Sequence, residues 1–184
     1  RQAQEILLQP LARRACLELA RSALGEGLSS DQMLAIVERS EGNAFYLEEL
    51  IRAVAESPLG SGLPKTVLGM IEARLARLHP DARRTLRAAS IFGSSCWRNG
   101  VFALLGEEEE AHGSAFNMLL EAELLVRSNT RRFANEEEYT FRHELIREAS
   151  YGMLTERDRR LGHRLAGAWL EKIGEIDPAI LAEH

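Results

Sequence analysis

Apolar residues recur every three or four positions along almost the whole chain, the spacing that places side chains on one face of an α-helix. Before residue 57 this pattern predicts three helices, with apolar stripes at Leu11, Ala15, Leu19 and Ala23, at Met33, Ile36 and Val37, and at Leu47, Leu50, Ile51 and Val54. Gly25 and Gly42 follow the first two stripes, and glycine commonly ends a helix. Ser30 or Asp31 is expected to cap the second helix, because such side chains accept hydrogen bonds from unpaired backbone amides. Asn43 is expected to cap the third helix in the same way, so residues 1–57 predict a helical subdomain.

The helical periodicity lapses at Ser57-Pro58-Leu59-Gly60-Ser61-Gly62, where proline, glycine and serine cluster. These residues interrupt helices and favour turns and loops. We therefore expect a linker at residues 58–63 and a second domain that begins at residue 64.

Residues 64–154 combine helical periodicity with one pair of β-favouring segments. The helical stripes lie at Val67, Ile71, Leu75 and Leu78, at Leu86 and Ala89, at Val101, Leu104 and Leu105, and at Phe116, Leu119, Leu120 and Leu124. Residues 125–128 and 139–142 favour β-structure and flank a polar segment at 129–138, so they predict one hairpin with a poorly structured tip. Three helices, a hairpin and a closing helix form the pattern of a winged-helix domain.

Residues 155–184 predict two further helices. The first has an apolar stripe at Leu161, Leu165, Trp169 and Leu170, and the second starts at Asp177-Pro178. The expected fold class is therefore mainly α. It comprises a helical subdomain, a winged-helix-like domain with one small β-hairpin, and helices that begin a helical array.

Composition is that of a soluble globular protein: 45% of the 184 residues are hydrophobic and 28% are charged. No stretch approaches the roughly 20 apolar residues of a membrane span, and no secretory signal leads the chain. Cys16 and Cys96 are too few and too far apart for a disulfide framework, so we expect a cytoplasmic protein in which both cysteines are core residues. The chain begins at Arg1 instead of a methionine and ends without a turn or cap signal, so we expect it to be part of a longer protein.

The sequence contains no pattern that predicts a catalytic centre or a metal site. Lys65-Thr66 has the residue types that end a phosphate-binding P-loop, but Pro64 stands where that loop needs glycine and lacks an N–H to donate. Motifs of the His-Glu-x-x-His and Cys-x-x-Cys types are absent. We therefore assign no catalytic residues and no metal ligands to this segment.

Several motifs resemble one known family. Gly42-Asn43-Ala44-Phe45-Tyr46-Leu47-Glu48-Glu49-Leu50 resembles the Gly-Asn-Pro-Phe-Tyr-Leu-Glu-Glu-Leu signature of AAA+ ATPases of the signal-transduction (STAND) class. Residues 63–67, 71–75, 88–93 and 139–154 are similar to segments that follow in that family, in the same order. The resemblance covers nearly the whole chain and identifies it as a lid subdomain and a winged helix that lack the P-loop.

The resemblance implies a role for the whole polypeptide. The segment would be the non-catalytic C-terminal part of an ATP/ADP-dependent switch that relays nucleotide state to a sensor or output domain. The nucleotide, with Mg in the parent protein, would be bound mainly by a nucleotide-binding domain elsewhere on the polypeptide. Bacterial members carry protein-kinase, cyclase or DNA-binding domains and tetratricopeptide-like arrays, and residues 157–170 resemble large serine/threonine kinase regulators. The expected partners are the nucleotide-binding domain and the helical array of the same chain, without a membrane.

The resemblance also implies site residues. In the family, a histidine of the winged helix reaches the β-phosphate of ADP, and His143 is the matching residue. An imidazole at a helix start can donate to a phosphate and gain charge beside it. The lid element that lies against the adenine corresponds to Gly42, Asn43 and Ala44. The family has proline at the position of Ala44, so the adenine contact is expected to be weakened or lost.

Two other functions are compatible with the sequence. The helices could form a scaffold that binds a protein partner, with Gly42 serving only as a helix stop and His143 only as a helix cap or core residue. The winged helix could instead bind DNA, but residues 65–150 contain twelve basic and thirteen acidic residues. The expected recognition helix also carries Glu121 and Glu123 and no basic residue, so charge disfavours nucleic acid.

Overall fold

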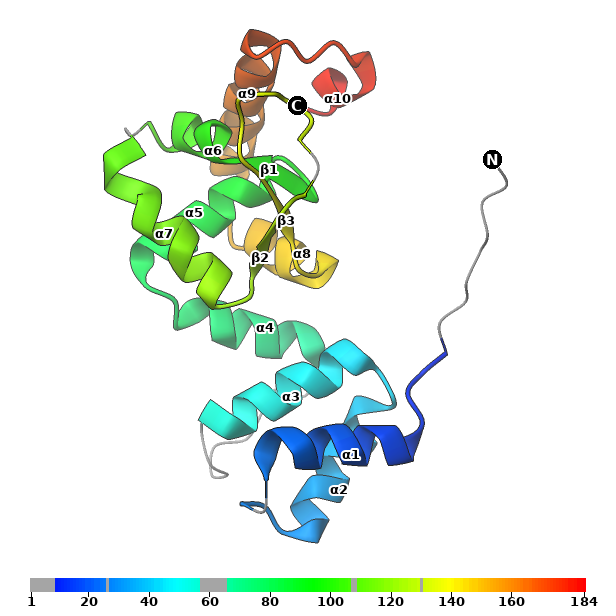
Figure 1. The fold of residues 1–184 in the computed structure, drawn as a ribbon. Helices are drawn as coiled ribbons and strands as arrows, with labels where there is room; N and C mark the ends of the chain where they lie inside the picture. Colours follow the sequence, from blue (N-terminus) through cyan, green and yellow to red (C-terminus); the bar gives the residue numbers. More distant parts are fainter. Residues whose placement is uncertain (1–8, 26, 57–65, 107–108, 130) are drawn as a thin grey trace. The chain divides into compact units, whose positions relative to one another are not determined.

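The computed structural model describes residues 9–25, 27–56, 66–106, 109–129 and 131–184. These residues form ten helices and three short strands, which confirms a mainly helical protein. The chain divides into two compact units, Arg1–Met70 and Ile71–His184 (Figure 1). The linker expected at residues 58–63 lies outside the described residues.

Unit 1 contains the three helices that periodicity predicts: α1 (Arg13–Leu24), α2 (Ser30–Ser40) and α3 (Ala44–Glu56). The cap of α2 is Ser29 and not Ser30 or Asp31, because the Ser29 hydroxyl accepts from the Gln32 amide while the Gln32 side chain accepts from the Ser29 amide. This reciprocal capping box satisfies two amides at once. Asn43 caps α3 as expected.

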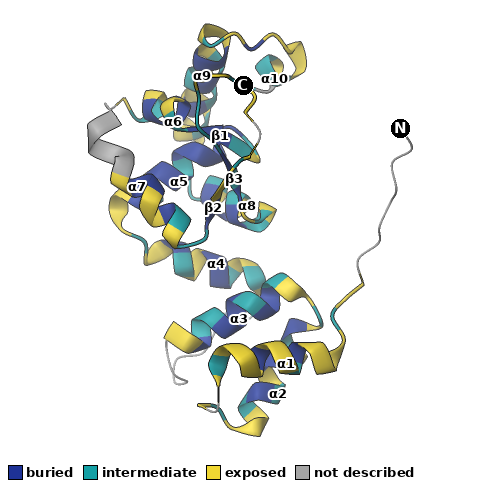
Figure 2. Cartoon of the chain, viewed as in Figure 1, coloured by how far each residue is buried: buried dark blue, intermediate teal, exposed yellow. Residues whose placement is uncertain are grey.

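The core of unit 1 lies between these helices, with Met70 of α4 (Val67–Ala76) added to it. Figure 2 shows that exposed and buried residues fall on different sides of the helices, as an amphipathic pattern requires. The buried core residues are Cys16, Ala20, Met33, Ile36, Val37, Tyr46, Leu47, Leu50, Ile51, Val54 and Met70.

Unit 2 begins with helices that precede and follow a first strand. The elements are α5 (Pro80–Ser90), β1 (Ser95–Trp97), α6 (Arg98–Leu105), α7 (Glu109–Glu121), β2 (Leu125–Arg127), β3 (Glu138–Phe141), α8 (Glu144–Gly152), α9 (Glu156–Lys172) and α10 (Pro178–Glu183). The last two are the helices expected after residue 155. None of the described helices has the length and apolarity that a membrane span needs.

The sheet of unit 2 has one strand more than expected. Its order is β1-β3-β2, and both pairings are antiparallel, so β3 is the central strand (Figure 1). Strands β2 and β3 are the expected hairpin, with Val126 opposite Thr140. Strand β1, which pairs Cys96 with Tyr139, adds to this hairpin a third strand that the sequence did not predict. The three residues of β1 are too few for an alternating pattern, and only their distant partner makes them a strand.

Residues 132 and 133, in the polar segment between β2 and β3, make contacts that its composition does not indicate. The Phe133 ring lies 5.2 Å from the ring of Trp97 and 6.4 Å from that of Trp169. Nearby, Arg132 Nε lies 2.8 Å from a carboxylate oxygen of Glu175, which is buried. One aromatic anchor and one ion pair therefore fix this loop against β1, α9 and the turn after α9.

Candidate functional site

His143 lies between β3 and α8 and caps the helix. Its backbone is extended, with φ −149° and ψ 144°, and its Nδ1 accepts a hydrogen bond from the Leu145 amide at 3.2 Å. In a neutral imidazole, the nitrogen that accepts carries no proton, so this cap requires the tautomer with the proton on Nε2. His143 is half-buried, and its Nδ1 is occupied by the cap of α8.

Glu144 already places a carboxylate in the first turn of α8 and forms an ion pair with Arg147.

Gly42, Asn43 and Ala44 form the connection from α2 to α3. Gly42 has φ +78°, and its carbonyl accepts from the Leu11 amide at 2.8 Å. The Asn43 side chain accepts from the Tyr46 amide at 2.9 Å. Ala44 is exposed and is the first residue of α3, a position that also suits proline, since the first helical amide needs no partner within the helix.

These four residues fall into two groups. Gly42, Asn43 and Ala44 are consecutive residues of unit 1, whereas His143 belongs to unit 2, and each unit is described by itself. Within unit 1 the exposed side chains of Asn43 and Ala44 stand at the positive end of a thirteen-residue helix. Each group thus places a helix N-terminus beside the residue that the family resemblance selects.

Arginines of the β2–β3 region are engaged in ion pairs within the chain. Arg127 lies 3.7 Å from Glu137, which also forms a 3.0 Å ion pair with Arg98. Arg132 pairs with Glu175. These three arginines thus neutralise carboxylates of the same unit.

The Glu175 carboxylate is buried and has several partners, two of which bind the same oxygen, Oε1. It accepts hydrogen bonds from the backbone amides of Asp177 at 2.9 Å and Ile176 at 3.0 Å. The Asp177 hydrogen bond, together with Arg132, holds the pKa of this carboxyl below its ordinary value of 4.5, although burial acts in the opposite direction. Its ionised form is therefore favoured by the folded chain.

We expect Glu175→Gln to lower the free energy of unfolding of unit 2 by about 1 kcal/mol near neutral pH, as for other partly exposed ion pairs. A carboxyl whose pKa is lowered by folding stabilises the protein above its unfolded-state pKa, and this stabilisation is lost as pH falls through the folded-state pKa. The difference between wild type and variant should therefore shrink below about pH 4.5. Urea unfolding followed by tryptophan fluorescence reports on unit 2, because Trp97 and Trp169 are the only tryptophans.

The pKa of Glu137 is lowered too, chiefly by its hydrogen bond from Arg98, so wild type loses stability in acid for more than one reason. The difference in the free energy of unfolding between wild type and Glu175→Gln, taken at each pH, isolates the contribution of Glu175. A difference that stays constant from neutral to acid pH would contradict a role for the Glu175 charge.

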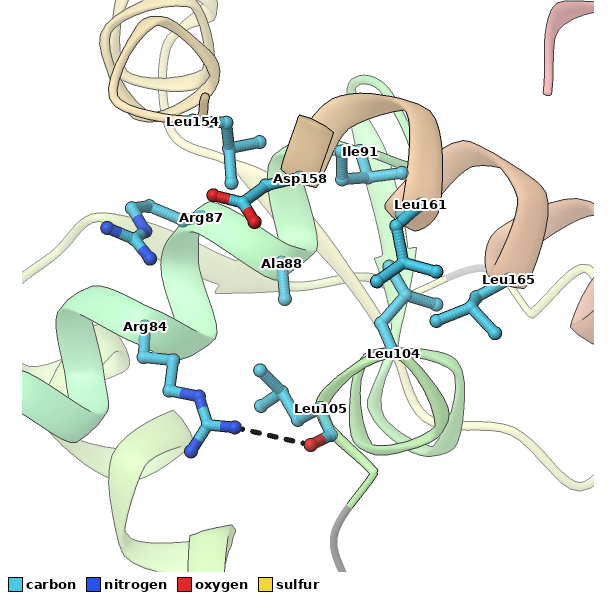
Figure 3. A pocket seen from close by; sticks show the side chains of 11 residues that line it. Arg84, Arg87, Ala88, Ile91, Leu104, Leu105, Leu154, Asp158, Leu161 and Leu165 are labelled. Carbon is cyan, nitrogen blue, oxygen red and sulfur yellow. Dashed lines mark hydrogen bonds between the residues drawn. The ribbon is translucent and has the colours of Figure 1, made fainter. Parts of the chain in front are cut away.

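Sequence patterns gave no sign of a pocket that unit 2 forms between α5, α6 and α9. Its volume is about 160 Å³. In Figure 3, Leu104, Leu161 and Leu165 gather on one side of it, and Arg84, Arg87 and Asp158 lie on the opposite side. The lining residues are Arg84, Arg87, Ala88, Ile91, Leu104, Leu105, Leu154, Asp158, Leu161, Gly162 and Leu165. They come from separate helices, so no local motif could have grouped them.

Comparison with protein-family models and with curated protein sequences finds no match to this chain. Among the described residues, His, Cys, Asp and Glu side chains form no group of three or more that could hold a metal ion.

Proposed function

We propose that this chain is the non-catalytic C-terminal part of an ATP/ADP-dependent signal-transduction ATPase of the STAND class. The observation that carries the proposal is the position of His143. It lies two residues after the end of β3 and caps α8 through Nδ1. An imidazole at a helix N-terminus is suited to a phosphate oxygen, and the family resemblance assigns that contact to this residue.

The arrangement of unit 2 supports a winged helix. The elements follow the order α5, β1, α6, α7, β2 and β3, and the sheet order β1-β3-β2 places the last strand between the other two. The loop from β2 to β3 would be the wing. Helices α9 and α10 would then begin the tetratricopeptide-like array that the resemblance implies.

A connected set of contacts supports a relay from His143 to α9. His143 begins α8, and Tyr151 lies in the last turn of that helix. The Tyr151 hydroxyl lies 3.0 Å from His163 Nε2, and the Arg159 guanidinium lies 4.5 Å from the centre of the Tyr151 ring. Helix α8 is thus tied to α9 at the end opposite His143. A change of nucleotide that displaced α8 would displace α9 with it, as a ligand-biased switch requires.

The test is ADP affinity in the full-length protein whose reading frame contains this chain. We expect His143→Ala to weaken ADP binding about tenfold, because a hydrogen bond to a charged group contributes about 1.5–3 kcal/mol. His143→Asn should weaken it similarly while keeping a helix cap, since asparagine is among the best capping residues. Isothermal titration with ADP measures both variants, and their unfolding temperatures show whether the cap is retained.

His79 provides a matched control. It caps α5 in the same way, with Nδ1 3.4 Å from the Asp81 amide, and it has no assigned role toward nucleotide. His79→Ala should leave the ADP affinity unchanged. Unchanged affinity in His143→Asn would overturn the phosphate contact, and a full-length protein without a P-loop or ADP binding would overturn the proposed function.

A scaffold that binds a protein partner is the second candidate. It is favoured by Ala44, which replaces the family proline, and by the pocket between α5, α6 and α9. In that case the nucleotide motifs would be vestigial, and His143→Asn would leave any activity of the parent protein intact.

A further inference from the structure

Two histidines of unit 2 lie in direct contact. His163 belongs to α9 and His184 follows α10, and their Nδ1 atoms lie 2.8 Å apart. Two nitrogen atoms at this distance share a proton, which one ring carries and the lone pair of the other accepts. Both side chains are half-buried. The contact therefore joins the end of α10 to α9 through a group that can gain or lose protons.

His163 has a second partner on the other side of its ring. The Tyr151 hydroxyl of α8 lies 3.0 Å from His163 Nε2. A hydroxyl can donate or accept, so Tyr151 can serve His163 whether Nε2 carries a proton or not. Adding or removing a proton at His163 therefore changes its bond with His184 and leaves the bond with Tyr151 in place.

His184 is also packed against neighbouring groups. Its ring centre lies 6.2 Å from that of Phe92, in the turn after α5. A Cβ added at Gly167 of α9 would lie 3.4 Å from the His184 Cβ, so the backbone of α9 runs close beside this residue. The position of His184 consequently reports on whether α10 is docked on α9.

The histidine pair tolerates one extra proton but not two. With one extra proton, an imidazolium donates to the lone pair of a neutral imidazole, and a charge-assisted hydrogen bond of this kind is stronger than a neutral one. With two extra protons, both Nδ1 atoms carry hydrogen, so two donors and two like charges face each other. The contact is thus strongest with one extra proton, weaker with none, and broken with two.

Other ionisable groups lie around the histidine pair. Arg159 of α9 lies 4.5 Å from the centre of the Tyr151 ring, Asp177 caps α10 through the Ala179 amide, and Glu183 precedes His184 in the sequence. A nearby cation disfavours both protonation steps of the pair, and a nearby carboxylate favours both. Such charges move the two steps together, whereas the separation between the steps arises within the pair.

We propose that His163 and His184 form a proton-sensitive latch that holds α10 on α9 most tightly when the pair carries one extra proton. Histidine is the side chain that ordinarily changes charge near neutral pH, so a modest change in pH would alter the docking of α10. The latch contains none of the residues assigned to nucleotide, and it therefore goes beyond the proposed switch.

The sign of the pH dependence follows from linkage. The docked pair binds its first extra proton more readily than separated histidines do, so this contribution to docking is lost as pH rises through the upper step. The docked pair binds the second proton less readily, so docking is lost as pH falls through the lower step. Docking should therefore be tightest between the two steps, near the ordinary histidine pKa of about 6.5.

The test is an NMR titration of the isotopically labelled chain from about pH 4.5 to about pH 9, the range in which histidine changes charge. Two glycines added after His184 move the terminal carboxylate away from the pair. The ring protons of His163 and His184 should follow the same two steps, one on each side of pH 6.5, because coupled groups titrate as a pair. The nuclear Overhauser effect between the His184 and Phe92 rings should be largest between these steps and fall severalfold at the acid limit.

His184→Phe is the matched variant, because it keeps an aromatic ring and removes the shared proton. His163 should then titrate in one step, and the Overhauser effect between residue 184 and Phe92 should no longer depend on pH. His79 is the internal control, because it caps α5 and is not part of the pair. It should titrate in one step in both proteins.

Two results would overturn the proposal. If His163 and His184 each follow a separate single step, they do not share a proton. If the Overhauser effect between His184 and Phe92 stays constant from acid to alkaline pH, the pair does not control the docking of α10. Both measurements are made with His163 and His184 in place, so they decide the matter even where His184→Phe releases α10.

Discussion

Replacing Trp169 with alanine is expected to lower the free energy of unfolding of unit 2 by about 3–5 kcal/mol, the usual cost of deleting a buried aromatic side chain. Trp169 is only 9% exposed. Its ring centre lies 5.7 Å from that of Phe92, 5.9 Å from that of Trp97 and 6.4 Å from that of Phe133. These rings belong to four different parts of unit 2: α9, the turn after α5, β1 and the β2–β3 loop.

Urea unfolding measures this loss, and Trp97 remains as the fluorescent probe in the variant. Trp169→Phe is the control, because it keeps an aromatic ring and should cost only about 1–2 kcal/mol, clearly less than the alanine substitution. A Trp169→Ala variant that unfolds at the same urea concentration as wild type would show that α9 contributes nothing to the stability of the sheet.

The aromatic cluster also matters for the proposed switch. It fastens α9 to β1 and to the β2–β3 loop, while Tyr151 fastens α9 to α8. Both attachments are made of packed rings, which have few alternative arrangements at native packing density. In the proposed relay, His143 and α9 would consequently move as parts of one body.

The helices of this chain could be predicted because their signals are local. The apolar stripes of α2 and α3 each fit within four turns, and Asn43 stands next to the amides that it caps. For α1 the helix was predicted but its buried face was not, because Ala15, Leu19 and Ala23 are exposed and Cys16 and Ala20 are buried instead. The predicted cap of α2, Ser30, differs from the observed cap, Ser29, by only one residue. Both residues carry a hydroxyl, and only the reciprocal hydrogen bonds with Gln32 distinguish them.

The sheet and the loop could not be predicted to the same extent because their determinants are distant in sequence. Strand β1 forms its ladder hydrogen bonds with β3, which lies more than forty residues later in the sequence. Ser95, for example, pairs with Thr140. Phe133 is a single aromatic residue in a polar segment, and it packs as a core residue only because Trp97 and Trp169 lie beside it. No window of neighbouring residues contains this information.

The same distinction applies to the sites. The capping geometry of His143 and Asn43 follows from their positions before helices, so the sequence sufficed to select them. The pocket depends on α5, α6 and α9 meeting, and Arg87 looks like any surface arginine until its Nε is found buried. Tertiary contacts were therefore necessary to recognise it.

Replacing Gly42 with alanine is expected to destabilise unit 1 by about 3 kcal/mol. A methyl group at Gly42 would lie 2.8 Å from the Leu11 carbonyl oxygen and 3.0 Å from Pro10 Cβ, and the first of these is backbone. The left-handed φ of +78° adds about 1–2 kcal/mol for a residue with a side chain, and overpacking adds about 1–3 kcal/mol. Because the residue serves folding, its substitution cannot isolate a contact with nucleotide.

Labelling of Cys16 with a thiol reagent measures this destabilisation within unit 1. Cys16 is 1% exposed, and its Sγ lies 3.8 Å from the same Leu11 carbonyl oxygen. When opening is in rapid equilibrium, a loss of about 3 kcal/mol raises the labelling rate of Cys16 about a hundredfold. Cys96, which is fully buried in unit 2, is the internal reference in the same reaction.

Gly106→Ala separates the two causes of the lost stability, the left-handed backbone conformation and the overpacking. Gly106 ends α6 with φ +68°, and an added methyl group would meet nothing within 4 Å. Only the backbone strain of about 1–2 kcal/mol remains there, so the labelling rate of Cys96 should rise only about five- to thirtyfold. The increase in the labelling rate of Cys16 caused by Gly42→Ala is compared with the increase for Cys96 caused by Gly106→Ala. If the first increase is no larger than the second, Pro10 and Leu11 move to make room for the added methyl group. The close approach at Gly42 would then contribute no specificity to the fold.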